Sequence, residues 1–267
     1  MLRPSSHPGK PTCAADPAWE TRTLPRESTR SPHHETLLKR RAEATSVAVF
    51  CDFDGTFSVQ DVGSTLARRY LGEKREDLWS RFAEGEFTPW SYNIELFEGF
   101  RLPQAELDQF LAGIDIDEGG QALIDWCRKT GASFEVLSDG FDYNLDKLQE
   151  INAIRFDYAA NHLRYEGDEW VISPGAPNPD CECGTGTCKR GIIDAARAAR
   201  KGCFCVHVGN GRVSDLCGAL AADLAFAKDT LAPALDERDA PYEPYDNLNH
   251  VIAGLDALAR DARAERS

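Results

Sequence analysis

The sequence predicts an α/β protein with a Rossmann-like parallel sheet, helices on both faces and a small inserted helical domain. Short apolar runs that end in polar or glycine-rich residues alternate with segments of helical periodicity. The expected strands are 47–51, 133–138, 203–208 and 224–227, and the expected helices are 119–131, 143–151, 188–202 and 214–223. Ligands of such sheets bind at the carboxyl ends of the strands, so we expect the functional residues there.

Two segments interrupt this alternation. Residues 65–115 read as helical, because apolar residues recur at spacings of three and four and glycine and proline divide the segment. We expect them to form a helical cap between the two parts of a core, 46–64 and 116–267. A second insert, 156–187, begins as a β-hairpin and ends in a cysteine-rich loop.

The first 45 residues differ in composition from the rest of the chain. They are rich in proline, serine and arginine and lack a sustained apolar period, so they cannot bury enough surface to order themselves. Their acidic residues do not suit an organelle transit peptide. We therefore expect residues 1–45 to be a disordered tail or the product of a misassigned start.

The charge of the chain excludes some classes of partner. There are 44 acidic residues against 30 basic ones, which gives a formal net charge of −14. Such a protein is repelled by nucleic acids and by anionic membranes. No apolar run is long enough to span a bilayer, and no secretory signal precedes the core. We expect a cytoplasmic monomer or homodimer.

Two carboxylates, Asp52 and Asp54, follow the first expected strand in the stretch "DFDGT". Phosphoryl transfer through a covalent intermediate needs a nucleophile, a Mg²⁺ ion and an acid that protonates the leaving alkoxide. Two carboxylates one residue apart at a strand end can supply the nucleophile and the acid. Gly55 permits the sharp turn that such a loop requires.

Four motifs in order along the chain resemble those of the haloacid dehalogenase-like phosphatases. They are "DFDGT", the serine of "VLSDG", the lysine of "CKRG" and the loop "VGNGRVSD". The helical segment after the first motif is similar to the cap of the phosphoserine phosphatase branch. Asn161, His162 and the stretch "FAKD" further resemble the methionine-salvage phosphatases. The resemblance implies a Mg²⁺-dependent phosphatase that acts on a small phosphomonoester.

The resemblance also implies a role for each motif residue. Asp52 would be the nucleophile and Asp54 the general acid and base. The phosphate would be held by the Ser138 hydroxyl, the adjacent backbone at Asp139 and the Lys189 ammonium. The Mg²⁺ ligands would be Asp52, Asp54, Asn210 and Asp215. Asp61 would face the substrate and bind a polar or ammonium group, or lie in a hydrated hinge of the cap.

The fourth motif departs from the family pattern. Asn210 stands where the family usually has aspartate, and Asp215 follows it by five residues instead of four. An asparagine oxygen can bind Mg²⁺ but removes one negative charge from the site. The alternative to a phosphatase is therefore a catalytically weakened relative that binds a phosphorylated ligand, or a zinc-dependent interaction module.

The zinc alternative rests on three cysteines that lie close together in the sequence. Cys181, Cys183 and Cys188 could bind Zn²⁺ if Asp180, His162 or a neighbouring chain supplied a fourth ligand. Unliganded thiols, or a disulfide between Cys181 and Cys188, explain the same spacing.

Overall fold

The computed structural model describes residues 32–265, and its centre is a sheet of seven strands. The spatial order is β4-β3-β2-β1-β5-β6-β7. Neighbouring strands run parallel except β3 and β4, which are antiparallel. The bounds are β1 (Ser46–Asp52), β2 (Ser133–Phe141), β3 (Asp157–Glu166), β4 (Glu169–Ser173), β5 (Cys203–Gly209), β6 (Leu224–Ala227) and β7 (Glu243–Pro244).

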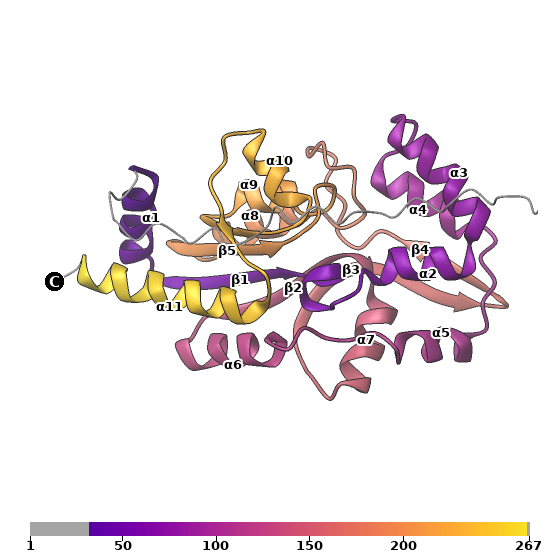
Figure 1. Ribbon diagram of the computed structural model, residues 1–267, viewed down its shortest axis with the longest axis horizontal. Helices are drawn as coiled ribbons and strands as arrows, with labels where there is room; N and C mark the ends of the chain where they lie inside the picture. Colours follow the sequence, from indigo (N-terminus) through magenta and orange to yellow (C-terminus); the bar gives the residue numbers. More distant parts are fainter. Residues whose placement is uncertain (1–31, 266–267) are drawn as a thin grey trace, which may run out of the picture.

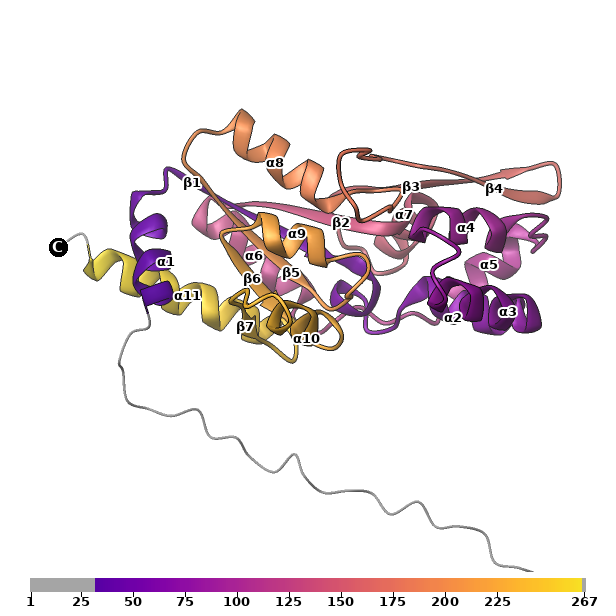
Figure 2. The same cartoon turned by 90° about the horizontal axis from the view of Figure 1, so that it is seen from above.

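Helices cover both faces of the sheet, as Figures 1 and 2 show. One face carries α6 (Gly120–Thr130), α7 (Asp142–Ile151) and α11 (Leu248–Ala264). The other carries α8 (Lys189–Ala199), α9 (Leu216–Ala221) and α10 (Leu231–Asp236). The predicted α/β fold with helices on both faces is confirmed. Among the described helices, none is long and apolar enough to cross a membrane.

Strand β1 lies in the middle of the sheet because both of its faces are apolar. Val49 and Cys51 belong to the core on one face, and Ala48 and Phe50 belong to the core on the other. A strand that is buried on both sides is typical of the interior of a parallel sheet. The chain leaves this strand at Asp52, at the carboxyl edge of the sheet.

Four helices lie between the turn after β1 and helix α6: α2 (Val62–Tyr70), α3 (Gly72–Ala83), α4 (Pro89–Phe97) and α5 (Gln104–Leu111). We call them the helical segment. Figure 1 places it beyond the carboxyl ends of the central strands. Local signals fix where two of these helices begin: Asp61 caps α2, and Thr88 forms a reciprocal capping box with Ser91 at α4.

The hairpin β3–β4, which the sequence predicted at the start of the second insert, is continuous with the sheet. β3 pairs in parallel with β2 from Glu135 to Leu137 and only then continues as a hairpin with β4. The hairpin also contacts the helical segment, because the backbone N–H of Trp170 donates to Phe100 O (2.9 Å) and its indole N–H to Leu102 O (2.8 Å).

The expectation of a disordered tail over residues 1–45 is wrong for its last part. Residues Pro32–Glu43 form helix α1, which contacts α11, and strand β1 begins at Ser46. Leu37 and Leu38 are buried in the core, and Arg40 forms an ion pair with Asp223. Two adjacent leucines are too few to show a helical period in the sequence, but their burial attaches α1 to the core. Residues 1–31 lie outside the described part of the chain.

Candidate active site

The turn after β1, Phe53–Phe57, places the first motif at the sheet edge. Gly55 has a φ of 79°, in the region that glycine tolerates best. A Cβ atom at this position would lie 2.5 Å from the side-chain nitrogen of Asn210. Glycine is therefore needed both for the turn and for the close approach of the fourth motif.

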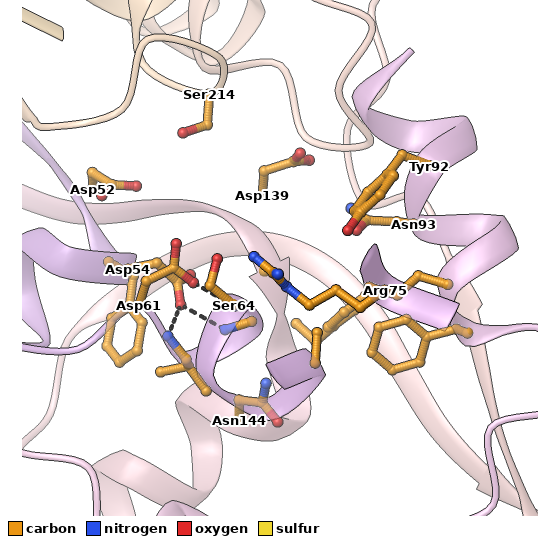
Figure 3. A pocket seen from close by; sticks show the side chains of 18 of the residues that line it. Asp52, Asp54, Asp61, Ser64, Arg75, Tyr92, Asn93, Asp139, Asn144 and Ser214 are labelled. Atoms are coloured by element: carbon orange, nitrogen blue, oxygen red, sulfur yellow. Dashed lines mark hydrogen bonds between the residues drawn. The ribbon is translucent and has the colours of Figure 1, made fainter. Parts of the chain in front are cut away.

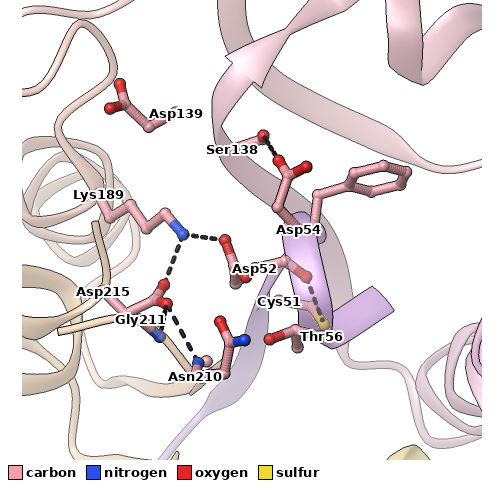
Figure 4. A network of polar contacts seen from close by, with 12 residues as sticks. Cys51, Asp52, Asp54, Thr56, Ser138, Asp139, Lys189, Asn210, Gly211 and Asp215 are labelled. Atoms are coloured by element: carbon pink, nitrogen blue, oxygen red, sulfur yellow. Dashed lines mark hydrogen bonds and ion pairs between the residues drawn. The ribbon is translucent and has the colours of Figure 1, made fainter. Parts of the chain in front are cut away.

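A buried lysine joins the first, third and fourth motifs, as Figure 4 shows. The Lys189 ammonium is fully buried and bonds to Asp52 Oδ1 and to Asp215 Oδ1, the latter at 2.5 Å. Burial and the charge of Asp215 raise the pKa of Asp52, although Lys189 opposes the shift. Two carboxylates around one ammonium leave this network with an excess of negative charge when both are ionised, which favours a further cation.

Asp215 holds this network in place. Its Oδ1 contacts Lys189 and lies 3.1 Å from His207 Nε2, and its Oδ2 accepts the backbone N–H groups of Asn210 (3.1 Å) and Gly211 (2.8 Å). A carboxylate has about four lone-pair sites, and all four are occupied here. In this structure Asp215 positions Lys189 and the 210–211 backbone, and its expected role as a metal ligand stays a prediction.

Asp54 is held beside Asp52 by hydrogen bonds to both of its carboxylate oxygens. Oδ1 accepts the backbone N–H of Val62 (2.8 Å), and Oδ2 accepts the hydroxyl of Ser138 (3.2 Å). A Cβ atom at position 140 would lie 2.8 Å from Asp54 Oδ2, so this approach requires Gly140. Burial, together with the charge of Asp61, raises the pKa of Asp54 to about 7. Such a carboxyl group can both donate and accept a proton near neutral pH.

The Asp139 carboxylate is occupied by a structural task. Its Oδ1 accepts hydrogen bonds from the side chain of Asn161 (3.0 Å) and from the backbone N–H groups of Gly186 (2.9 Å) and Thr187 (3.1 Å). These bonds tie the loop before α8 to the end of β2. The expected contact with phosphate involves the backbone of Asp139 and stays a prediction.

Asp61 lies at the edge of the same cavity and caps a helix. Its Oδ1 accepts the backbone N–H of Ser64 at 2.7 Å, at the start of α2. The side chain is exposed and also lines the pocket. The structure thus adds a capping role to the two roles that the sequence left open.

A pocket opens between the sheet edge and the helical segment (Figure 3). Asp52 and Asp54 line its floor, and Arg75 points into it from α3. Its polar and aromatic lining from the helical segment is Ser64, Arg75, Trp79, Tyr92 and Asn93. Arg75 and Trp79 are not among the residues that the sequence indicated, because nothing in the sequence distinguishes them from the solvent-facing residues of an amphipathic helix.

The residues at the floor fit a Mg²⁺ ion. Asp52 Oδ2 is buried and has no hydrogen-bond partner within residues 32–265, so it needs another ligand. The Asn210 side chain lies beside Asp52 in Figure 4 and offers an amide oxygen. An all-oxygen donor set of this kind is what Mg²⁺ prefers.

The fold and the arrangement of these motif residues resemble those of the haloacid dehalogenase-like phosphatases, as the motifs predicted. A probable phosphoserine phosphatase from Vibrio cholerae superposes with a TM-score of 0.65 at 19% identity, over 90% of this chain and 76% of that one. A phosphoserine phosphatase solved as a phospho-aspartyl intermediate analogue gives 0.60 at 20% identity, over 79% and 98%. The chain matches no protein-family model.

The relatives found by sequence indicate a narrower group of phosphatases than the structural neighbours do. The chain is 28% identical over 213 residues to the 2-hydroxy-3-keto-5-methylthiopentenyl-1-phosphate phosphatase of Bacillus pumilus, covering 79% of this chain and 91% of the relative. It is 26% identical over 223 residues to the enzyme of the same name from Brevibacillus brevis, covering 80% and 97%. The predicted similarity to the methionine-salvage phosphatases is confirmed.

Proposed function

We propose that the protein is a Mg²⁺-dependent phosphatase that hydrolyses a small phosphomonoester through an aspartyl-phosphate on Asp52. The observation that carries this proposal is the pairing of a buried carboxylate, Asp52, with a partly buried one, Asp54, at one pocket floor. Asp52 has one oxygen bonded to Lys189 and the other without a partner in the described chain. Asp54 has a pKa near neutrality and is held by Ser138.

The first step forms a bond between Asp52 and phosphorus. The bond from phosphorus to the ester oxygen breaks, and its electron pair leaves with that oxygen, which takes the proton of Asp54. Lys189 holds the Asp52 carboxylate in place and offsets charge at the adduct. Mg²⁺, held by oxygens of Asp52 and Asn210 and the Asp54 carbonyl, would neutralise charge on the phosphoryl oxygens when bound.

The second step releases inorganic phosphate. Asp54, now ionised, takes a proton from a water molecule, and the water oxygen attacks phosphorus while the bond to Asp52 breaks. The Ser138 hydroxyl bonds to Asp54 and lies at the carboxyl end of β2. It is therefore placed to orient both Asp54 and the phosphoryl group.

The helical segment would select the substrate. Its wall combines the Arg75 guanidinium with the rings of Trp79 and Tyr92, and apolar side chains such as Leu96 and Phe97 complete the lining. This lining fits a substrate with an oxygen-rich head beside the phosphate and an apolar tail. The substrate named for the Bacillus and Brevibacillus relatives has that chemistry.

The test is phosphate release from a panel of small phosphomonoesters, with and without Mg²⁺. The panel includes 2-hydroxy-3-keto-5-methylthiopentenyl-1-phosphate and phosphoserine. We expect metal-dependent turnover that Asp52→Asn lowers by on the order of a thousandfold or more. The matched control is Asp125→Asn on α6, which removes an exposed carboxylate and should keep full activity.

Asn210 supports the alternative of a catalytically weakened relative that binds a phosphorylated ligand. Its side-chain amide is neutral and therefore contributes no negative charge toward a metal. The amide nitrogen donates a hydrogen bond to Asp229 Oδ2 at 3.4 Å. We expect Asn210→Asp to lower the Mg²⁺ concentration needed for half-maximal activity. If the natural chain has no turnover on the panel and Asn210→Asp has, the alternative holds and the phosphatase proposal is wrong.

A further inference from the structure

Four cysteines from three parts of the chain meet next to the active site. Cys181 and Cys183 lie in the loop after β4, Cys188 caps α8, and Cys217 lies in α9. Their Sγ atoms all lie within 4.8 Å of one another. The first three were candidates by sequence; Cys217 supplies a fourth ligand in place of Asp180, His162 or a neighbouring chain.

The spacing of the sulfurs suits a metal better than a disulfide. A tetrahedral zinc with Zn–S bonds of about 2.3 Å separates its four sulfurs by about 3.8 Å. Sulfurs that lie within 4.8 Å of one another reach that shell by small movements. A disulfide would join only two of the four and leave the other pair without a function. None of the four takes part in a disulfide in this structure.

Polar groups around the cluster are placed to stabilise thiolates. The backbone N–H of Gly191 donates to Cys188 Sγ at 3.4 Å, and the Thr185 hydroxyl lies 3.2 Å from Cys183 Sγ. Hydrogen bonds of this kind orient metal-bound ligands and support their charge. The amino end of α8, where Cys188 lies, adds a favourable dipole.

We propose that Cys181, Cys183, Cys188 and Cys217 bind one Zn²⁺ ion in a closed structural site. Four protein ligands leave no open position, so this zinc would hold the fold together and take no part in the reaction. Soft thiolates select zinc over magnesium, so the two metals do not compete for one site.

The position of the cluster in the chain gives this zinc a task. Cys188 directly precedes Lys189, and Cys217 follows Asp215 by two residues. The zinc would therefore link the two backbone segments that carry the ends of the Lys189–Asp215 ion pair. The same loop reaches the helical segment, because the backbone N–H of Trp90 donates to Gly184 O at 2.9 Å.

The test measures metal directly and needs no substrate. The full chain, purified without chelators, should contain one zinc per chain by elemental analysis and native mass spectrometry. Replacement of that zinc by Co²⁺ should give the strong visible absorption of a tetrahedral tetrathiolate. Asp52→Asn should keep both signals, so a failure of the phosphatase proposal leaves this test intact.

Two variants locate the ion. Cys217→Ser should lose the zinc and the cobalt absorption and lower the melting temperature. Cys203→Ala, which removes a buried thiol of β5 outside the cluster, should keep both signals. A natural chain that binds neither zinc nor cobalt, a disulfide between Cys181 and Cys188, or full zinc content in Cys217→Ser would each overturn the proposal.

Discussion

The two walls of the pocket differ in how their polar groups are held. On the sheet side, Lys189 and Asp52 are buried and Asp54 is partly buried, and all three are bonded to one another or to fixed neighbours. On the helical side, Arg75 makes no ion pair with any residue that the structure describes, and its guanidinium lies 5.9 Å from the centre of the Trp79 ring. Trp79 itself is half exposed.

Under the proposed function, this difference separates the groups that take part in the reaction from the groups that select the substrate. Groups that are fixed before the substrate arrives lose no energy to reorganisation during the reaction. Groups that keep some freedom can adjust to the part of the substrate that does not react. We therefore expect changes in the sheet wall to lower kcat and stability, and changes in the helical wall to alter KM.

The largest effect should come from breaking the sheet wall at its centre. Lys189→Met keeps a similar volume but leaves the buried carboxylates of Asp52 and Asp215 without their cation, which should cost about 3–5 kcal/mol of unfolding free energy. Urea denaturation measures this loss. Lys147→Met, at a partly exposed ion pair with Asp108, is the matched control and should cost about 1 kcal/mol or less. Equal losses of unfolding free energy in both variants would contradict the view that the sheet wall is held by its buried ion pairs.

A second change on the sheet wall should affect the reaction but leave the fold intact. Asp54→Asn keeps the shape of the side chain but removes the proton donor, so kcat should fall by about 10²–10⁴. The loss should be smaller for a substrate with a good leaving group, such as an aryl phosphate, because that oxygen needs no proton. Steady-state kinetics on alkyl and aryl phosphates measures this, and an equal loss on both would remove Asp54 from the role of acid.

The helical wall should respond in KM. Arg75→Met keeps the length of the side chain but removes the cation, so KM should rise by about tenfold and kcat should change little. Arg128→Met on α6, whose guanidinium is exposed, is the control and should leave both constants unchanged. A large fall in kcat with unchanged KM would place Arg75 in the reaction and break the distinction between the walls.

The smallest effect concerns the support behind the sheet wall. Asp142 lies directly after β2. Burial alone would raise the pKa of its carboxyl group, but the hydrogen bonds that the carboxylate accepts lower this pKa overall. The donors are the side chains of Arg164 and His162 and the backbone N–H groups of Leu163 and Tyr143. A lowered pKa stabilises the fold above the ordinary aspartate value, and this contribution is lost as pH falls through the folded pKa. Asp142→Asn should therefore cost about 1 kcal/mol at pH 7 and almost nothing in strong acid. A pH series of urea denaturations measures this, and a constant cost at every pH would contradict it.

The sheet and its motifs could be predicted from the sequence, because short stretches of neighbouring residues are enough to indicate each strand and the motif that follows it. The strand from Ser46 to Asp52 is a run of apolar residues that ends in a carboxylate. The same pattern placed Ser138 at a strand end and Lys189 at a helix start, and parallel topology then brings them to one edge. Whether these residues perform the predicted steps is a question for the kinetics above.

The remaining features depend on contacts between distant parts of the chain. Cys217 sits alone in a small-residue helix and becomes a ligand candidate only when α9 packs beside α8. The saturation of Asp215 depends on His207 Nε2 and on the backbone of the 210–211 loop. The spacing of apolar residues in the sequence does not predict such contacts, because they arise from tertiary packing.

Trp170 attaches the helical segment to the hairpin. Its backbone and indole N–H groups hold residues 100 and 102 against the hairpin, between α4 and α5. Beyond that point, Gln104 and Asp108 of α5 bond to Tyr143 of α7. With the backbone bond from Trp90 to Gly184, these contacts attach α4 and α5 to the rest of the molecule, so the position of the helical wall depends on the hairpin and the cysteine loop as well as on the sheet edge.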